Sequence, residues 1–123
     1  MKKILIIEDE SAIQKTISDV LAQEGYETAS ATDGEAGLQM ATTEKPDLIL
    51  LDLVLPKMHG FEVLKALKEN PETQDIPIIV LTNLESTSDI EKALELGATT
   101  YLVKASYTLE EIVQKIKKAL GNS

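Results

Sequence analysis

Five short apolar segments recur along the chain and predict five β-strands. They are Ile4 to Ile7, Tyr26 to Ala31, Leu48 to Leu51, Ile78 to Leu81 and Thr100 to Val103. Three of these segments are nearly continuous runs of Ile, Leu and Val. Such runs favour parallel strands that are covered on both faces of a sheet.

The segments between and after these strands carry apolar residues three or four positions apart, which is the spacing of an amphipathic helix. These residues are Ile13, Ile17, Val20 and Leu21; Ala36, Met40 and Ala41; Phe61, Leu64 and Leu67; Ile90, Ala93 and Leu94; and Ile112, Val113, Ile116 and Leu120. The last helix follows a capping-box pattern, Thr108 to Glu111, and Gly121 ends it. Strict alternation of strand and helix predicts a doubly wound (βα)5 fold with one five-stranded parallel sheet.

Length, charge, hydropathy and the absence of cysteine exclude several classes of protein. Residues 1–123 are enough for one domain with a buried core. A net charge of −9 opposes direct binding to nucleic acid. No stretch approaches the roughly 20 apolar residues that cross a bilayer, and the absence of cysteine excludes thiol chemistry. We therefore expect a soluble, cytoplasmic domain without membrane insertion.

Polar side chains follow four of the predicted strands. The first strand leads into Glu8-Asp9, the third into Asp52, the fourth into Thr82 and the fifth into Lys104. Ligands of such sheets bind beyond the carboxyl ends of the strands, so these residues are expected to converge. Three carboxylates in one place need a cation, and Mg²⁺ suits hard oxygen ligands. Because a carboxylate can attack phosphorus when nearby cations and hydroxyl groups offset the charge, the pattern predicts a phospho-acceptor site.

Four motifs make the sequence resemble a known family, the receiver domains of two-component response regulators. They are Ile4 to Glu10, Asp52 to Gly60, Val80 to Thr82, and Gly97 to Lys104. Each motif is weak alone, but the set, in this order and at strand ends, is specific. The resemblance covers Lys3 to about Leu120 and implies a flavodoxin-like, CheY-like three-layer sandwich.

The resemblance also implies a role for each polar residue. Asp52 accepts a phosphoryl group from a phosphohistidine on a sensor histidine kinase or a histidine phosphotransfer protein. Thr82 and Lys104 contact the phosphoryl oxygens. The implied Mg²⁺ ligands are Glu8 through water, Asp9, Asp52 and the backbone carbonyl of Val54. Such a domain is a signalling switch and not an enzyme, although it can catalyse its own phosphorylation and slow dephosphorylation.

A conformational change is part of what the resemblance implies. Tyr101 stands where the family keeps an aromatic ring that turns when Thr82 is drawn toward phosphate, although plain strand packing explains Tyr101 equally well. The surface of the helix around Ile90, the strand Thr100 to Val103 and the final helix would then be read by a downstream protein or would form a phosphorylation-dependent homodimer. Whether the domain acts alone or within a longer regulator stays open.

Three departures from the family pattern bear on geometry and rate. Ala105 follows Lys104 where the family usually has Pro, so we expect the loop to place the lysine differently. Asn83 stands where the family prefers a very small residue and is expected to crowd the phosphoryl site. Val54 and Leu84 are apolar and cannot orient a hydrolytic water, so we expect a long-lived phosphoryl group.

Two alternatives remain. A phosphohydrolase of the haloacid-dehalogenase type also uses an Asp nucleophile, but its second Asp, two positions later, corresponds to Val54 here. A receiver-like scaffold that is not phosphorylated fits Asn83 and Ala105, whereas Thr82, Lys104 and the acids oppose it. A flavin-binding module is disfavoured because no hydroxyl-rich phosphate loop follows the first strand.

Overall fold

Strands and helices alternate along residues 1–121, the part of the chain that the computed structural model describes. The strands are β1 (Lys3–Ile7), β2 (Glu27–Ala31), β3 (Leu48–Leu51), β4 (Ile78–Thr82) and β5 (Thr100–Val103). The helices are α1 (Ser11–Gln23), α2 (Gly34–Thr43), α3 (Gly60–Glu69), α4 (Thr87–Glu95) and α5 (Leu109–Ala119), and a short 3-10 helix, η1 (Lys104–Ser106), precedes α5. The predicted (βα)5 pattern is confirmed, while its expected end at residue 123 lies outside the described residues.

A few element boundaries differ from the prediction by one residue. Tyr26 lies just before β2, and its side chain is buried against the helices of the α1 side. β4 runs one residue further and includes Thr82. Leu120 caps α5 and does not continue it. The predicted capping box is present, because the Thr108 hydroxyl accepts from the Glu111 amide at 3.1 Å and the Glu111 carboxylate accepts from the Thr108 amide at 2.9 Å.

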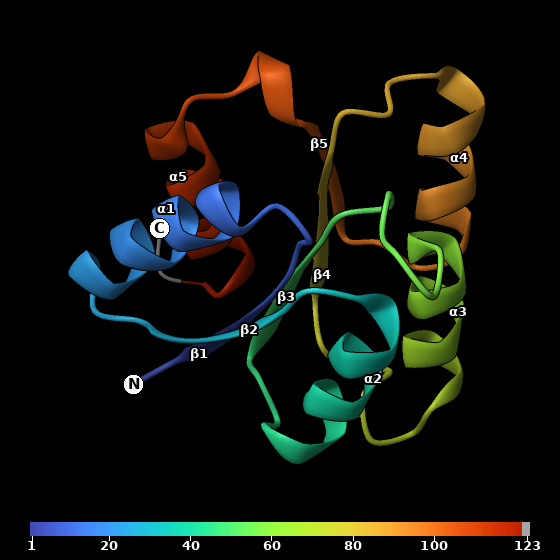
Figure 1. Cartoon of the computed structure of the whole chain (residues 1–123), viewed down its shortest axis with the longest axis horizontal. Coiled ribbons are helices and arrows are strands. Elements are labelled where there is room, and N and C mark those ends of the chain that lie inside the picture. Colours follow the sequence, from blue (N-terminus) through green and yellow to red (C-terminus); the bar gives the residue numbers. More distant parts are fainter. Residues whose placement is uncertain (122–123) are drawn as a thin grey trace.

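The five strands form one parallel sheet in the order β2-β1-β3-β4-β5. Helices α1 and α5 cover one face, and α2, α3 and α4 cover the other, which gives three layers (Figure 1). All residues of β3 and β4 are buried, as their continuous apolar runs predicted. The strand order reverses between β1 and β3. In such sheets the crevice beyond the carboxyl ends of these two strands is the usual ligand site.

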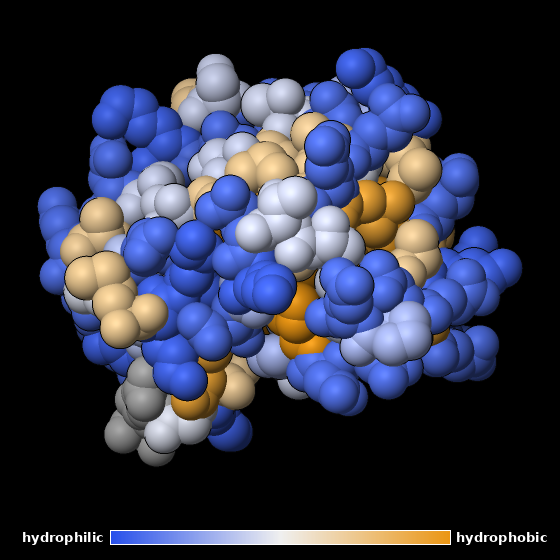
Figure 2. Space-filling model, turned by 90° about the horizontal axis from the view of Figure 1, so that it is seen from below, coloured by the Kyte–Doolittle hydropathy of each residue, from blue (hydrophilic) through white to orange (hydrophobic). Residues whose placement is uncertain are grey.

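The outer strand β2 and the surface around it are polar. Glu27 and Ser30 of β2 are exposed, and the Glu27 carboxylate lies 3.2 Å from the ammonium of Lys3 on β1. Seen from below the view of Figure 1, most of the surface is hydrophilic, with only small hydrophobic areas (Figure 2). Among the helices of residues 1–121, none combines the length and apolar character that a membrane span requires.

Burial predicts where the stability of the fold resides. Leu51, directly before Asp52, is fully buried in the core on the α2 and α3 side, whereas Leu94 on α4 is 47% exposed. Leu51→Ala should lower the free energy of unfolding by about 2–5 kcal/mol, because it leaves a cavity. Leu94→Ala makes the same chemical change at an exposed position and should cost about 0.5 kcal/mol. Urea denaturation measures both values, and equal losses would contradict the assigned core.

Candidate functional site

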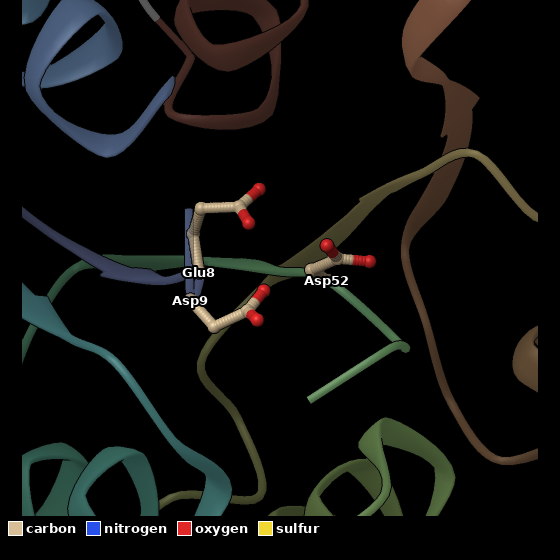
Figure 3. Close-up of side chains that lie close together, drawn as sticks. All are labelled: Glu8, Asp9 and Asp52. Atoms are coloured by element: carbon tan, nitrogen blue, oxygen red, sulfur yellow. The ribbon is translucent and has the colours of Figure 1, made fainter. Parts of the chain in front are cut away.

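Two neighbouring strands end in carboxylates. β1 leads into Glu8 and Asp9, and β3 leads into Asp52; the parallel pairing of Ile7 with Leu51 sets these ends side by side. One oxygen of each acid lies within 4.8 Å of the others. Figure 3 shows the three side chains gathered at the ends of the two strands. The structure therefore brings together the three acids that the sequence placed at strand ends.

The three carboxylates differ in exposure. Glu8 and Asp52 are 3% and 5% exposed, whereas Asp9 is open to solvent. A buried charge needs polar partners. The Glu8 carboxylate accepts a hydrogen bond from the Glu10 amide at 3.1 Å, and that of Asp52 accepts one from the Val54 amide at 3.2 Å. Backbone N–H groups thus satisfy part of the buried charge.

Lys104 supplies an ammonium group at the centre of the site. Its Nζ lies 2.5 Å from an oxygen of Glu8 and 3.0 Å from an oxygen of Asp52. Burial raises the pKa of the Glu8 carboxyl, although the bond to Lys104 opposes this. Burial alone would lower the pKa of the Lys104 ammonium, but its bonds to Glu8 and Asp52 outweigh burial and raise that pKa. Lys104 therefore remains a cation.

The lysine reaches the acids even though Ala105 follows it. The bond between Lys104 and Ala105 is trans, and Lys104 opens the 3-10 helix η1. The expected displacement of Lys104 by the missing Pro does not take it out of the site, because its ammonium contacts two carboxylates.

The hydroxyl groups of Thr82 and Tyr101 both bond to the backbone of Leu84, in the loop between β4 and α4. Thr82 is fully buried, and its Oγ1 accepts a long bond of 3.5 Å from the Leu84 amide. The Tyr101 hydroxyl donates to the Leu84 carbonyl at 2.6 Å. Burial, with contributions from Asp89 and Asp52, raises the pKa of Tyr101, so its hydroxyl keeps the proton that it donates. Thr82 and Tyr101 are thereby linked through the backbone of Leu84.

A pocket of about 260 Å³ opens over these groups. Its lining residues are Asp9, Glu10, Asp52, Val54, Asn83 and Lys104. A water molecule takes about 30 Å³ of the liquid, so a hydrated ion or a phosphoryl group fits this volume. Asn83 forms part of the pocket wall, and its crowding of a phosphoryl group stays a prediction.

The chain after Asp52 forms a short loop, residues 53–59, which we call the acceptor loop. The Gly60 amide donates to the Leu53 carbonyl at 2.9 Å and closes the loop. A Cβ on Gly60 would overlap Cα of Leu53 and lie 2.8 Å from the Asp52 carbonyl oxygen, so only glycine fits there. His59 ends the loop and caps α3, because its Nδ1 accepts from the Phe61 amide at 3.1 Å.

One residue of α1 that the sequence pattern did not single out also supports the site. The Gln14 side-chain amide donates to the carbonyls of Glu8 and Ala31, each at 3.0 Å, and so ties the ends of β1 and β2 together. The sequence feature that could have indicated this role is a long polar side chain, Gln14, one helical turn after Glu10. That signal is weak, since most such residues on a helix face solvent.

The donor set fits a hard divalent cation. The Lys104 ammonium leaves two of the three negative charges of Glu8, Asp9 and Asp52 uncompensated. Asp9 and Asp52 both line the open pocket, where a cation could keep part of its water. Few protein oxygens and several waters are the coordination that Mg²⁺ prefers.

Comparisons with known proteins identify the family. The family model described as the response regulator receiver domain matches residues 4–117. The alkaline phosphatase synthesis transcriptional regulatory protein PhoP of Bacillus subtilis is 40% identical over 122 residues, which are 99% of this chain and 50% of PhoP. Sporulation initiation phosphotransferase F of the same organism is 38% identical over 119 residues, 97% of this chain and 94% of that protein.

The chain spans about half the length of PhoP and of several other matched regulators. A solved structure has the same fold. It is the receiver domain of a sensor histidine kinase from Pseudomonas aeruginosa, described with a magnesium ion coordinated in its active-site cleft. The superposition has a TM-score of 0.88 at 28% identity and covers 98% of both chains. Taken with the strand order and the family model, this shows that the chain belongs to the response regulator receiver domains, the signalling domains of two-component systems.

Proposed function

We propose that the domain is a phosphorylation-dependent switch in which Asp52 accepts a phosphoryl group from a phosphohistidine. The observation that supports this most is the placement of Asp52: its carboxylate is buried at the end of β3, lines an open pocket and contacts Lys104. A sensor histidine kinase or a histidine phosphotransfer protein is the proposed donor. The similarity over nearly the full length of a sporulation phosphotransferase supports a phosphotransfer role.

The proposed transfer exchanges one bond to phosphorus for another. A carboxylate oxygen of Asp52 forms a bond to phosphorus while the bond from phosphorus to the imidazole nitrogen breaks. That nitrogen leaves with the electron pair, and the product is an acyl phosphate. Lys104 lies 3.0 Å from Asp52 and offsets negative charge on the transferring oxygens. The Thr82 hydroxyl is the proposed donor to one of these oxygens.

Mg²⁺ is the proposed cofactor, and it would neutralise charge on the phosphoryl oxygens during transfer. Asp9, Asp52 and the Val54 carbonyl are the proposed direct ligands, with Glu8 acting through water. The cluster of acidic oxygens supports this assignment, as does the magnesium ion described for the Pseudomonas aeruginosa receiver domain. The apolar side chain of Val54, 54% exposed beside the site, supports slow hydrolysis of the phosphoryl group.

The output surface that we propose consists of α4, β5 and α5. Tyr101 on β5 is tied by its hydroxyl to Leu84 in the loop that precedes α4. A displacement of Thr82, at the end of β4 and bonded to the Leu84 amide, can therefore reach this surface. Leu94 on α4 is exposed there and is available for contact. The partner is a downstream protein or a second phosphorylated copy, and we propose that signalling takes place in the cytoplasm.

Phosphorylation should require Asp52. Incubation with acetyl phosphate and Mg²⁺ should add one phosphoryl group to the wild type and none to Asp52→Asn, as intact-mass spectrometry would show. Asp19→Asn is the control, because Asp19 is an exposed acid on α1 paired with Lys15 at 2.9 Å. Equal phosphorylation of Asp52→Asn would exclude Asp52 as the acceptor.

Metal affinity should depend on Asp9. Asp9→Ala removes a carboxylate of the acidic cluster and should raise the Mg²⁺ dissociation constant about tenfold or more, as measured by calorimetric titration. Glu10→Ala, next in the chain and also at the pocket, should change it little because Glu10 is not a proposed ligand. An unchanged constant for Asp9→Ala would refute the metal assignment.

The switch should act through the Tyr101 hydroxyl. Beryllofluoride with Mg²⁺ mimics the phosphoryl group and should shift the NMR signals of Thr82, Tyr101 and α4. Tyr101→Phe loses the 2.6 Å bond to the Leu84 carbonyl and should reduce the α4 response while Asp52 is still phosphorylated. Tyr107→Phe, on the opposite face of the sheet, should leave the response intact. If α4 responded fully in Tyr101→Phe, the coupling between Asp52 and α4 would not depend on the Tyr101 hydroxyl.

A further inference from the structure

We propose that the N-terminus of α2, through Gly34 and Asp33, positions the acceptor loop and thereby the Val54 carbonyl. The link to metal binding rests on the proposed function, in which this carbonyl is a Mg²⁺ ligand. Neither residue is a member of the cluster Glu8, Asp9 and Asp52, so we treat both as positioning residues.

Gly34 lets α2 begin directly against the acceptor loop. A Cβ at this position would lie 2.6 Å from the carbonyl oxygen of Met58, 2.7 Å from the Met58 Cβ and 2.8 Å from a methyl carbon of Val63. The first two atoms belong to the acceptor loop and the third to α3. Contact with backbone and with a Cβ cannot be relieved by turning a side chain. Any residue larger than glycine must therefore push the loop and the start of α2 apart.

Asp33 adds a second connection between the same two segments. One of its carboxylate oxygens caps α2 by accepting from the Ala36 amide at 2.8 Å, and the other lies 3.7 Å from the ammonium of Lys57 in the acceptor loop. The Lys57 side chain is 62% exposed, so the ion pair contributes little by itself. The close steric contact at Gly34 is the stronger of the two connections.

The acceptor loop is short enough to transmit a displacement. It is closed by the bond from the Gly60 amide to the Leu53 carbonyl, and the Met58 amide donates to the Pro56 carbonyl at 2.7 Å. Lys57 has a φ of 67°, a left-handed conformation that a non-glycine residue holds only when its surroundings impose it. With both ends fixed, a movement of Met58 away from α2 changes the path of the chain back to Val54.

A matched pair of variants separates positioning from simple loss of stability. Gly34→Ala introduces the collision with the acceptor loop. Gly37→Ala changes a second buried glycine of α2, but the three atoms nearest to its Cβ would all belong to the side chain of Ile7, at 2.6 to 3.0 Å. Both variants should be less stable in urea denaturation. Gly34→Ala alone should raise the Mg²⁺ dissociation constant, about tenfold or more, and speed hydrogen exchange at the amides of the acceptor loop.

A second pair serves if Gly34→Ala does not fold. Asp33→Ala removes the cap of α2 and the contact with Lys57, whereas Thr108→Ala removes the cap of α5, a helix on the other face. Asp33→Ala should speed exchange in the acceptor loop and weaken Mg²⁺ binding severalfold, and Thr108→Ala should do neither.

The readouts distinguish this inference from the proposed function. A wild type that binds no Mg²⁺ would overturn the metal site, while faster exchange of the acceptor loop in Gly34→Ala than in Gly37→Ala would still support positioning by α2. Equal exchange in the two variants, or a Mg²⁺ dissociation constant in Gly34→Ala within twofold of the wild type, would overturn the positioning role.

Discussion

Two buried carboxylates, those of Glu8 and Asp52, share the ammonium group of Lys104, and this contact joins the carboxyl ends of β1, β3 and β5. Removing one partner from a buried ion pair typically costs about 3–5 kcal/mol, because the remaining charge is left without compensation. The sheet therefore depends on the same groups that the proposed chemistry uses. An arriving cation or phosphoryl group alters the charge balance of this cluster, so ligand binding and the packing of three strand ends are linked.

The buried strands were predictable because a continuous apolar run is stable only where both faces of the strand are covered. Four residues in a row such as Leu48 to Leu51 can be covered on both sides only in the middle of a parallel sheet, and that is where β3 lies. The gathering of Glu8, Asp9 and Asp52 followed from the same rule, since parallel strands deliver their last residues to one edge. The boundaries near Tyr26 and Thr82 differ by one residue, because the buried Tyr26 lies just outside the hydrogen-bonded ladder and the polar Thr82 lies inside it.

Side-chain contacts between elements that are distant in the sequence could not be predicted. The bonds of Gln14 to two strand ends and the tie from Tyr101 to the Leu84 carbonyl follow from the rotation of helices and the path of loops, which leave no periodic signal. The contacts of the Lys104 ammonium with two carboxylates also depend on how the strand ends meet in space, which the residue after the lysine does not indicate.

The polar character of β2 bears on how the domain behaves at high concentration. An outermost strand carries unpaired N–H and C=O groups along one side and can pair with the same strand of another molecule, which starts aggregation. In β2 the exposed Glu27 carries a charge, Ser30 is polar, and only Ala31 is buried. Pairing such strands would desolvate the polar side chains without covering much apolar surface. The edge thus discourages uncontrolled association and leaves assembly to other surfaces of the domain.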